Sequence, residues 1–131
     1  TQKAKEILIW VGFQTSQEQK VVKKNYRPLP SFITIKKSKI EGLGLFATQA
    51  IDKNKVIGIC HIIDERFYDG VIRTPLGGFI NHSNNPNCIK VLTKLNHNDA
   101  KLTTYMLKTK KNIKNNEELT LSYTLTEGFT N

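Results

Sequence analysis

Residues 78–88, which read Gly-Phe-Ile-Asn-His-Ser-Asn-Asn-Pro-Asn-Cys, are the stretch on which the interpretation of this chain depends. Its Asn, Ser and Pro residues are typical of a fixed backbone outside regular secondary structure. Asn81 and His82 could supply a general base, a metal ligand or only a polar turn. Because no second candidate metal ligand lies nearby, the spacing disfavours a metal site. Taken alone, the stretch predicts a structured polar loop.

Two further segments are equally ambiguous when each is taken alone. Residues 39–48 read Lys-Ile-Glu-Gly-Leu-Gly-Leu-Phe-Ala-Thr, and their Gly-x-Gly is either a tight turn or a place where a ligand lies against bare backbone. A dinucleotide-binding fingerprint would need a third glycine and a following helix, but a strand pattern follows here. Residues 117–123 read Glu-Glu-Leu-Thr-Leu-Ser-Tyr, and a tyrosine at such a strand end usually packs in the core or at its rim.

The composition describes a small basic domain. The chain has 131 residues, a hydrophobic fraction of 38% and a formal net charge of +9, which favours acidic or nucleic-acid-associated partners. No run of 18 apolar residues and no signal-peptide pattern is present, so we expect no membrane association. Its two cysteines and three histidines have no metal-ligand spacing, so we expect no bound metal. Such cysteine usage suits a reducing, intracellular location.

The residue pattern of the chain changes near residue 30. Residues 1–30 predict an N-terminal arm or one or two short helices, closed by an extended linker at Pro28 and Pro30. From residue 31 to residue 131 the pattern is one of short β-branched and apolar runs separated by turns. It predicts a mostly β domain with strands near residues 32–37, 45–48, 56–63, 91–93, 102–107 and 119–125.

In this order, the three segments resemble the motifs of the SET-domain protein lysine methyltransferases. In that family an Asn-His-Ser…Pro-Asn-Cys loop interlocks with a Glu-Leu…Tyr segment, and a Gly-x-Gly motif precedes both. The resemblance covers about residues 32–125. Within the family the chain is most similar to the compact viral and bacterial members, because flanking zinc modules and most of a helical insert are missing. It implies a SET fold, with small curved β-sheets around a C-terminal pseudoknot and the N-terminal arm beside them.

The resemblance also implies an activity and a cofactor. The expected reaction transfers a methyl group from S-adenosyl-L-methionine to the ε-amine of an accessible lysine in a protein substrate. Tyr123 falls at the catalytic position and would orient the reacting groups. By resemblance, the residues expected to hold the cofactor are Glu41, Gly42, Leu43, Gly44, Asn81, His82, Tyr123 and Phe129.

The expected substrate channel departs from the usual pattern of the family. Leu121 stands where members often carry Tyr or Phe, and Cys60 and His61 stand where another channel tyrosine is common. Phe67, Tyr68 or Tyr105 could supply a wall, of which we take Tyr105 as the candidate; a channel without the hydroxyl predicts multiple methylation. Phe129 is the sole C-terminal aromatic candidate to close the site. Otherwise the N-terminal arm or the second subunit of a homodimer would close it.

The chemistry explains why these groups are needed. The reaction is an in-line displacement that holds a neutral amine about 3 Å from the methyl carbon. Because the reference pKa of lysine is about 10.4, neutralising it near pH 7.5 costs roughly 4 kcal/mol. A narrow apolar channel helps because it disfavours the ammonium. A neutral Tyr123 hydroxyl and backbone carbonyls suit the weak C–H···O contacts that orient the methyl group.

Two alternatives remain at this stage. One is a catalytically inactive SET-like binding module that uses its basic surface to hold an acidic protein or nucleic acid, and the altered channel positions favour it. The other is an unrelated basic β-rich nucleic-acid binder, which predicts salt-sensitive affinity and no cofactor binding. The sequence leaves the substrate and the compartment, cytoplasmic or host nuclear, undecided.

Overall fold

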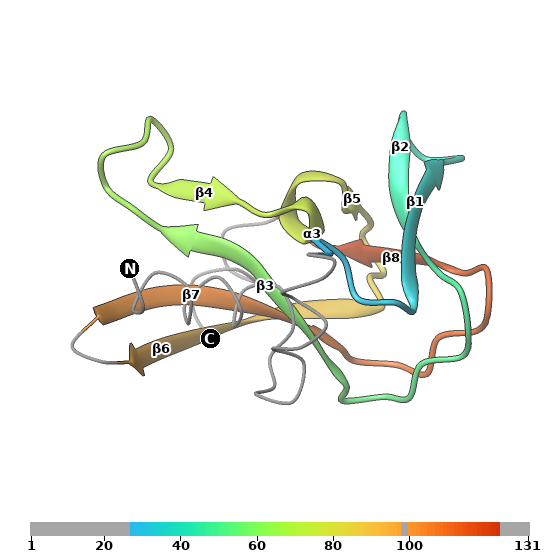
Figure 1. Cartoon of the computed structure of the whole chain (residues 1–131). Coiled ribbons are helices and arrows are strands. Elements are labelled where there is room, and N and C mark those ends of the chain that lie inside the picture. The colour runs from blue at the N-terminus through green and yellow to red at the C-terminus, as the bar shows by residue number, and fades with distance from the viewer. Residues whose placement is uncertain (1–26, 98–99, 124–131) are drawn as a thin grey trace.

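The computed structural model describes residues 27–97 and 100–123 (Figure 1). Most of the arm predicted over residues 1–30, and Phe129, therefore lie outside the described residues. The regular secondary structure of this part is almost entirely β-strand, which confirms the predicted mostly β fold class. In order, the elements are β1 (Ile33–Lys37), β2 (Leu43–Ala47), β3 (Val56–Ile63), β4 (Val71–Arg73), α3 (Pro75–Gly78), β5 (Asn81–His82), β6 (Cys88–His97), β7 (Ala100–Thr109) and β8 (Glu118–Leu121).

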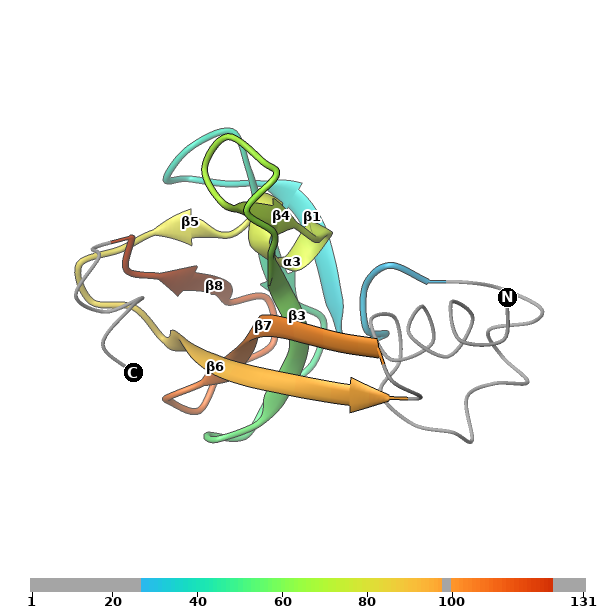
Figure 2. The same cartoon turned by 90° about the vertical axis from the view of Figure 1, so that its left-hand side faces the viewer.

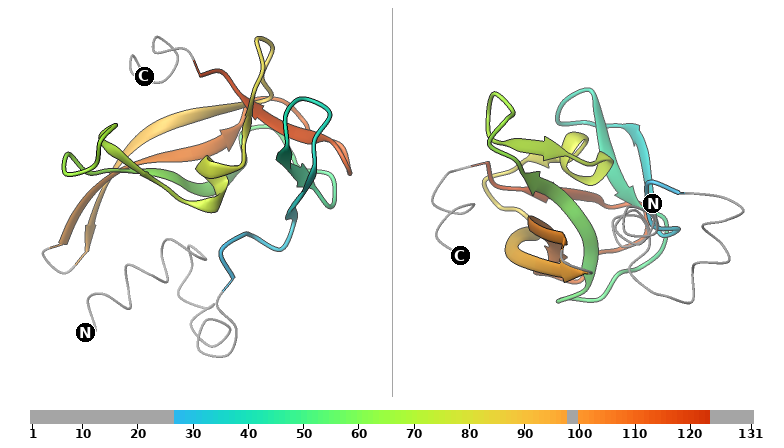
Figure 3. Two further views of the ribbon diagram at one scale, coloured as in Figure 1. Left: turned by 90° about the horizontal axis from the view of Figure 1, so that it is seen from above. Right: turned by 60° about the vertical axis from the view of Figure 1, so that its left-hand side comes forward.

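These strands form two four-stranded sheets. One has the order β1-β2-β8-β5, and the other has the order β4-β3-β7-β6. The β3–β4 and β6–β7 hairpins extend to the same side of the molecule, away from β1 and β2 (Figures 1 and 3). The β3–β7 pair contains two register irregularities, which bend a strand and increase its twist. The second sheet is therefore curved rather than flat.

One hydrophobic core joins the two sheets. It takes large side chains from both of them and from the connections between them, because each sheet alone has only one apolar face to bury. Leu45, Ile57, Leu107, Ile113 and Leu119 are its fully buried aliphatic members. The core fixes the relative position of the sheets, so residues far apart in sequence keep constant distances. No helix in the described ranges is long and apolar enough to cross a membrane.

The parallel pairing of β5 with β8 brings together the two segments that suggested the family. Asn81 lies opposite Thr120 and His82 opposite Leu121, and Figure 2 shows the two strands side by side. The loop after β5 fastens the other end of β8, because the buried Asn87 side chain accepts from Thr120 N (2.8 Å) and donates to Glu118 O (2.8 Å). The threading implied by a pseudoknot stays a prediction.

The structure differs from the predicted strands mainly in length and in the short elements. Strand β3 has the predicted bounds, whereas β6 and β7 extend well beyond residues 91–93 and 102–107. Strands β4 and β5 have two or three residues each, and they form because β3 and β8 offer free edges rather than because of their own pattern. Strand β8 ends at Leu121, after which the Tyr123 N–H donates to a side chain instead of a neighbouring strand.

Candidate active site

The side chain of Asn81 holds the glycine turn between β1 and β2. Its Nδ2 lies near the carbonyl oxygens of Glu41 (3.0 Å) and Leu43 (3.2 Å), Ser38 Oγ (3.1 Å) and Glu118 Oε2 (2.9 Å). An amide nitrogen carries only two hydrogens, so these four acceptors share them. A residue of β5 thereby fixes the backbone on both sides of Gly42.

Glu118 completes this glycine-turn network, which we define as Ser38, Glu41, Leu43, Asn81 and Glu118. Both carboxylate oxygens lie 2.9 Å from Ser38 Oγ, and one of them also accepts from Asn81. A Cβ at Gly44 would lie 2.2 Å from Glu118 Oε2, so only glycine permits this approach. The network therefore depends on a carboxylate at the start of β8 and a bare backbone in β2.

The space over Gly42 suits a ligand that lies against the backbone. Gly42 has φ of +45°, which other residues adopt at a cost, and a Cβ built there would meet nothing within 4 Å. Ile40 and Leu43 on the same turn are about half exposed, at 50% and 51%. The turn is thus held in place from the Asn81 side and open on the other. This geometry fits the cofactor-holding role that the resemblance assigns to residues 41–44.

His82 positions Tyr123. The ring Nδ1 of His82 accepts from the Tyr123 N–H at 2.9 Å, while Nε2 lies 2.9 Å from Asn84 Oδ1. The first contact requires a lone pair on Nδ1, so the proton sits on Nε2 and is donated to the Asn84 oxygen. The two rings pack with centroids 5.1 Å apart. The imidazole thus fixes the backbone of Tyr123 through Nδ1 and is itself held in place through Nε2.

The Tyr123 hydroxyl donates to the backbone carbonyl of Ile80, which directly precedes Asn81. Burial raises the pKa of this phenol, and Arg73 partly opposes the rise. The hydroxyl is therefore neutral near pH 7 and has lone pairs left to accept further contacts. Tyr123 as a whole is 59% exposed, so it occupies the rim of the domain rather than the core.

Tyr123 and Ile80 form part of the wall of a cavity of about 380 Å³. The cavity lies where the four-stranded sheet of β3, β4, β6 and β7 meets α3 and the end of β8. The residues that line it are His61, Asp69, Val71, Arg73, Gly77, Gly78, Ile80, Lys90, Tyr105, Leu121 and Tyr123. It thus has apolar, aromatic and cationic walls together.

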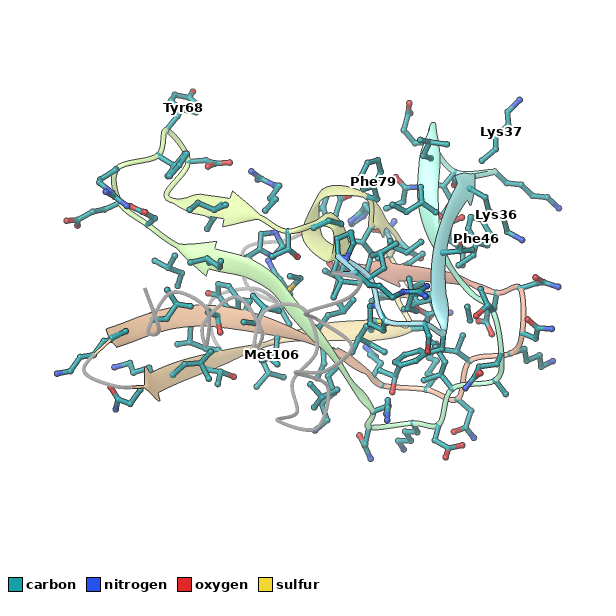
Figure 4. All side chains as sticks on the ribbon, viewed as in Figure 1. Lys36, Lys37, Phe46, Tyr68, Phe79 and Met106 are labelled. Atoms are coloured by element: carbon teal, nitrogen blue, oxygen red, sulfur yellow. The ribbon has the colours of Figure 1, made fainter. Side chains whose placement is uncertain are left out.

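The structure brings most, but not all, of the expected channel residues to this cavity. Leu121 and Tyr105 line it, whereas Cys60 lies behind it, fully buried, with Sγ 3.3 Å from the Tyr105 carbonyl. Burial raises the pKa of the Cys60 thiol to about 12, so this cysteine is a packed apolar group. Its neighbour His61 faces the cavity instead. Tyr68 is fully exposed at the tip of the β3–β4 hairpin (Figure 4).

The charged residues of the cavity are the part that sequence reasoning missed. Arg73 Nη1 forms an ion pair with Asp69 Oδ2 at 2.6 Å. Lys90 Nζ lies 5.1 Å from the centre of the Tyr105 ring. Burial lowers the pKa of His61 to about 4, with further lowering by Lys90 and Arg73 and some opposition from Asp69. Ser38 and Glu118 in the glycine-turn network were also missed, although Glu118 belongs to the quoted 117–123 segment.

Other exposed features are separate from this site. Lys36 packs its ammonium 4.7 Å from the centre of the Phe46 ring on the outer face of β1 and β2 (Figure 4). Within residues 27–97 and 100–123, no group of three or more His, Cys, Asp or Glu side chains is placed to hold a metal ion.

Comparisons with known proteins agree with this geometry. The family model of the SET domain matches residues 60–124, about half of the chain. A crystal structure of a candidate histone methyltransferase from Plasmodium falciparum is 25% identical, with a TM-score of 0.61 over 74% of this chain and 96% of that chain. No curated protein sequence gives a significant match.

A second similar structure shows the fold alone. It is a humanized mutant of Polycomb Repressive Complex 2 from Chaetomium thermophilum with a bound inhibitor, 22% identical, with a TM-score of 0.57. The match covers 75% of this chain but only 15% of that one. With the matching family model and the similar architecture, this chain belongs to the SET-domain family.

Proposed function

We propose that this domain transfers a methyl group from S-adenosylmethionine to the ε-amine of a lysine in a protein substrate. The observation that carries the proposal is the position of Tyr123. Its neutral hydroxyl stands in the wall of the cavity, beside the Ile80 carbonyl, and its backbone is fixed by His82. The SET-domain match and the similarity to a candidate histone methyltransferase support a methyltransferase in general.

Residues 41–44, with Asn81 and His82, would hold the cofactor. When bound, S-adenosylmethionine supplies an activated methyl group on a sulfonium centre. The chain contributes an open glycine turn whose carbonyl positions are set by Asn81. Because this turn is fixed before any ligand arrives, little backbone ordering would oppose binding.

Tyr123 and Ile80 would orient the reacting groups. Their two oxygens lie at one point of the cavity wall, and oxygen acceptors attract the polarised C–H groups of a methyl through weak hydrogen bonds. Leu121 lies in the same wall and brings no hydroxyl there. We therefore propose that the cavity admits an amine that already carries a methyl group, so that more than one methyl is added. Mass spectrometry of the modified lysine measures this number.

Tyr123→Phe tests the activity. The variant keeps the ring against His82 but loses the hydroxyl, and the loss of one such oriented group commonly costs about a hundredfold or more in rate. The assay incubates the protein with a mixed lysate and radiolabelled S-adenosylmethionine and counts label on lysine. Tyr68→Phe is the matched control, because Tyr68 is fully exposed and is not among the described residues that line the cavity. Equal labelling by wild type and Tyr123→Phe would contradict the assigned role.

The charge of the cavity favours one rival, an inactive SET-like module that binds an acidic partner. Two cations, Arg73 and Lys90, line the cavity that an incoming lysine would enter, and like charges repel. Calorimetry with S-adenosylmethionine separates the two functions, because an inactive module has no need of the cofactor. Heat of binding together with lysine labelling would support the enzyme. The absence of both would support the inactive module. The basic surface is proposed to serve acidic or nucleic-acid-associated partners in both cases.

A further inference from the structure

Four side chains from four different strands face the cavity together. His61 on β3 lies directly opposite both Arg73 on β4 and Tyr105 on β7. Residues directly opposite in antiparallel strands project from the same face of the sheet. Lys90 on β6 pairs with Leu107, two positions along β7 from Tyr105, so it projects from that face too. The sheet thus presents two cations, a histidine and a phenol toward Tyr123.

His61 shows what this arrangement does to a base inside the cavity. Its imidazole carries a pKa of about 4, well below the ordinary 6.5, and after burial the largest cause is Lys90, followed by Arg73. A nearby positive charge favours the neutral form of any base, whether an imidazole or an amine. The positions of Lys90 and Arg73 therefore disfavour any further cation in the cavity, whichever basic group enters it.

We propose that Lys90, assisted by Arg73, keeps the amine of an incoming substrate lysine unprotonated inside this cavity. The inference rests on the proposed methyl transfer, and it accounts for cations in a site that accepts lysine. The reactive form is the neutral amine, which at pH 7.5 is only about one molecule in a thousand for an ordinary lysine. The ammonium gives its proton to bulk water as it enters. Each tenfold gain in the neutral fraction is a tenfold gain in reactive complex.

The other charged and titratable groups around the cavity leave Lys90 as the main source of this effect. Asp69 opposes it but forms an ion pair with Arg73, which reduces the effect of both. Burial raises the pKa of Tyr105 and of Tyr123, so both phenols are neutral near pH 7. His61 is neutral there as well. The groups facing an amine in the cavity are therefore His61, Asp69, Arg73, Lys90, Tyr105 and Tyr123.

The first arm of the test measures the cavity without a substrate. NMR titration gives the pKa of His61 in the wild type, in Lys90→Met and Lys90→Gln, which remove the charge, and in Lys90→Arg, which keeps it. Lys94→Met is the matched control, since it removes the same charge from an exposed position of β6. We expect the His61 pKa to rise from about 4 toward 6.5 only when the Lys90 charge is lost. Equal values in all folded variants would overturn the proposal.

The second arm measures kcat against pH on the lysate protein that the wild type labels most strongly. The kcat profile reports groups in the bound complex, which is where the amine meets Lys90. We expect Lys90→Met to lose about tenfold at pH 7.5 and to converge with the wild type above about pH 11, where an ordinary lysine is mostly neutral. Lys90→Arg should follow the wild type throughout.

The outcomes of the two arms separate the two proposals. A rate for Lys90→Met that is reduced equally at every pH indicates a structural defect and overturns the inference about Lys90, while the proposed methyl transfer stands. Absence of lysine label with the wild type at any pH overturns the proposed function and this inference with it. A His61 pKa that responds to Lys90, together with a shifted kcat profile, supports both.

Discussion

The glycine-turn network and the cavity are built on different physical principles. The network on the β1, β2, β5 and β8 side is held by short hydrogen bonds that converge on Asn81 and on the Glu118 carboxylate. The cavity on the β3, β4, β6 and β7 side is defined by cations and aromatic rings, with Lys90 and Arg73 acting on His61 from other strands. The network centres on a carboxylate, whereas the described residues that line the cavity include two cations and only one carboxylate, that of Asp69.

This difference explains why the sequence did not point to the cations of the cavity. A hydrogen bond requires a particular donor and acceptor within a few tenths of an ångström, so the network fixes residue types at fixed positions. An electrostatic effect falls off gradually with distance, so a charge can act from any of several neighbouring positions. Motifs therefore identify the glycine-turn side, whereas the properties of the cavity follow from where the strands place ordinary lysines and arginines.

The largest expected effect comes from the helix that walls the cavity. A Cβ at Gly77 would lie 2.1 Å from the Cys60 carbonyl oxygen, which belongs to the backbone of β3, whereas a Cβ at Gly78 would meet nothing within 4 Å. We expect Gly77→Ala to lower the free energy of unfolding by about 3 kcal/mol, as forced overpacking does. Gly78→Ala should stay within about 1 kcal/mol of the wild type. Urea unfolding of both variants measures this, and equal stabilities would contradict the packing of α3 on β3.

Removal of the carboxylate tests the glycine-turn side. Glu118→Ala leaves Asn81 and Ser38 without a charged partner, and such hydrogen bonds contribute about 2 kcal/mol. We expect that loss in urea unfolding, and weaker S-adenosylmethionine binding in calorimetry, because the turn is no longer fixed. Glu41→Ala is the control, since Glu41 joins the network through its backbone carbonyl, which alanine retains. If both variants lose the same stability and affinity, the loss follows from the change in total charge rather than from the network.

The titration of His61 sharpens the cavity side of the comparison. Its pKa is about 4 in the folded protein and 6.5 ordinarily, so the unfolded chain binds the proton more readily between these values. The contribution of His61 to the free energy of unfolding is therefore fully present above pH 6.5 and is lost as the pH falls toward 4. Because the ring is partly open to solvent, screening leaves about 1 kcal/mol of this dependence. His61→Gln should flatten the curve of unfolding free energy between pH 4 and 6.5, and an unchanged slope would count against the buried neutral imidazole.

The smallest expected effect concerns the shape of the turn at Gly42. Its φ of +45° is left-handed, and Asn54 and Asn116 already adopt similar angles of 66° and 70°. Alanine tolerates this region poorly and asparagine tolerates it better. We expect Gly42→Ala to cost about 1 kcal/mol and Gly42→Asn about half as much, measured by urea unfolding. A stability order with alanine above asparagine would show that the turn relaxes away from this conformation.

The sequence predicted the fold better than it predicted the contacts within the site. The run of β-branched residues gave β3 its bounds, because the apolar pattern alone decides a strand that is buried along most of its length. It did not predict β4 and β5, since strands this short exist only through their partners. Asn81 and His82 were assigned to the cofactor by resemblance, and the cofactor contact stays a prediction. Their observed partners are the turn carbonyls and the Tyr123 backbone.

The sequence by itself determined the family and the mostly β architecture, because both are recorded in local pattern and in the spacing of motifs. Only the tertiary structure decided that Lys90, Arg73 and His61 share one cavity with Tyr123. They come from separate strands, and their mutual effect depends on distances through space that the order of residues along a chain does not contain.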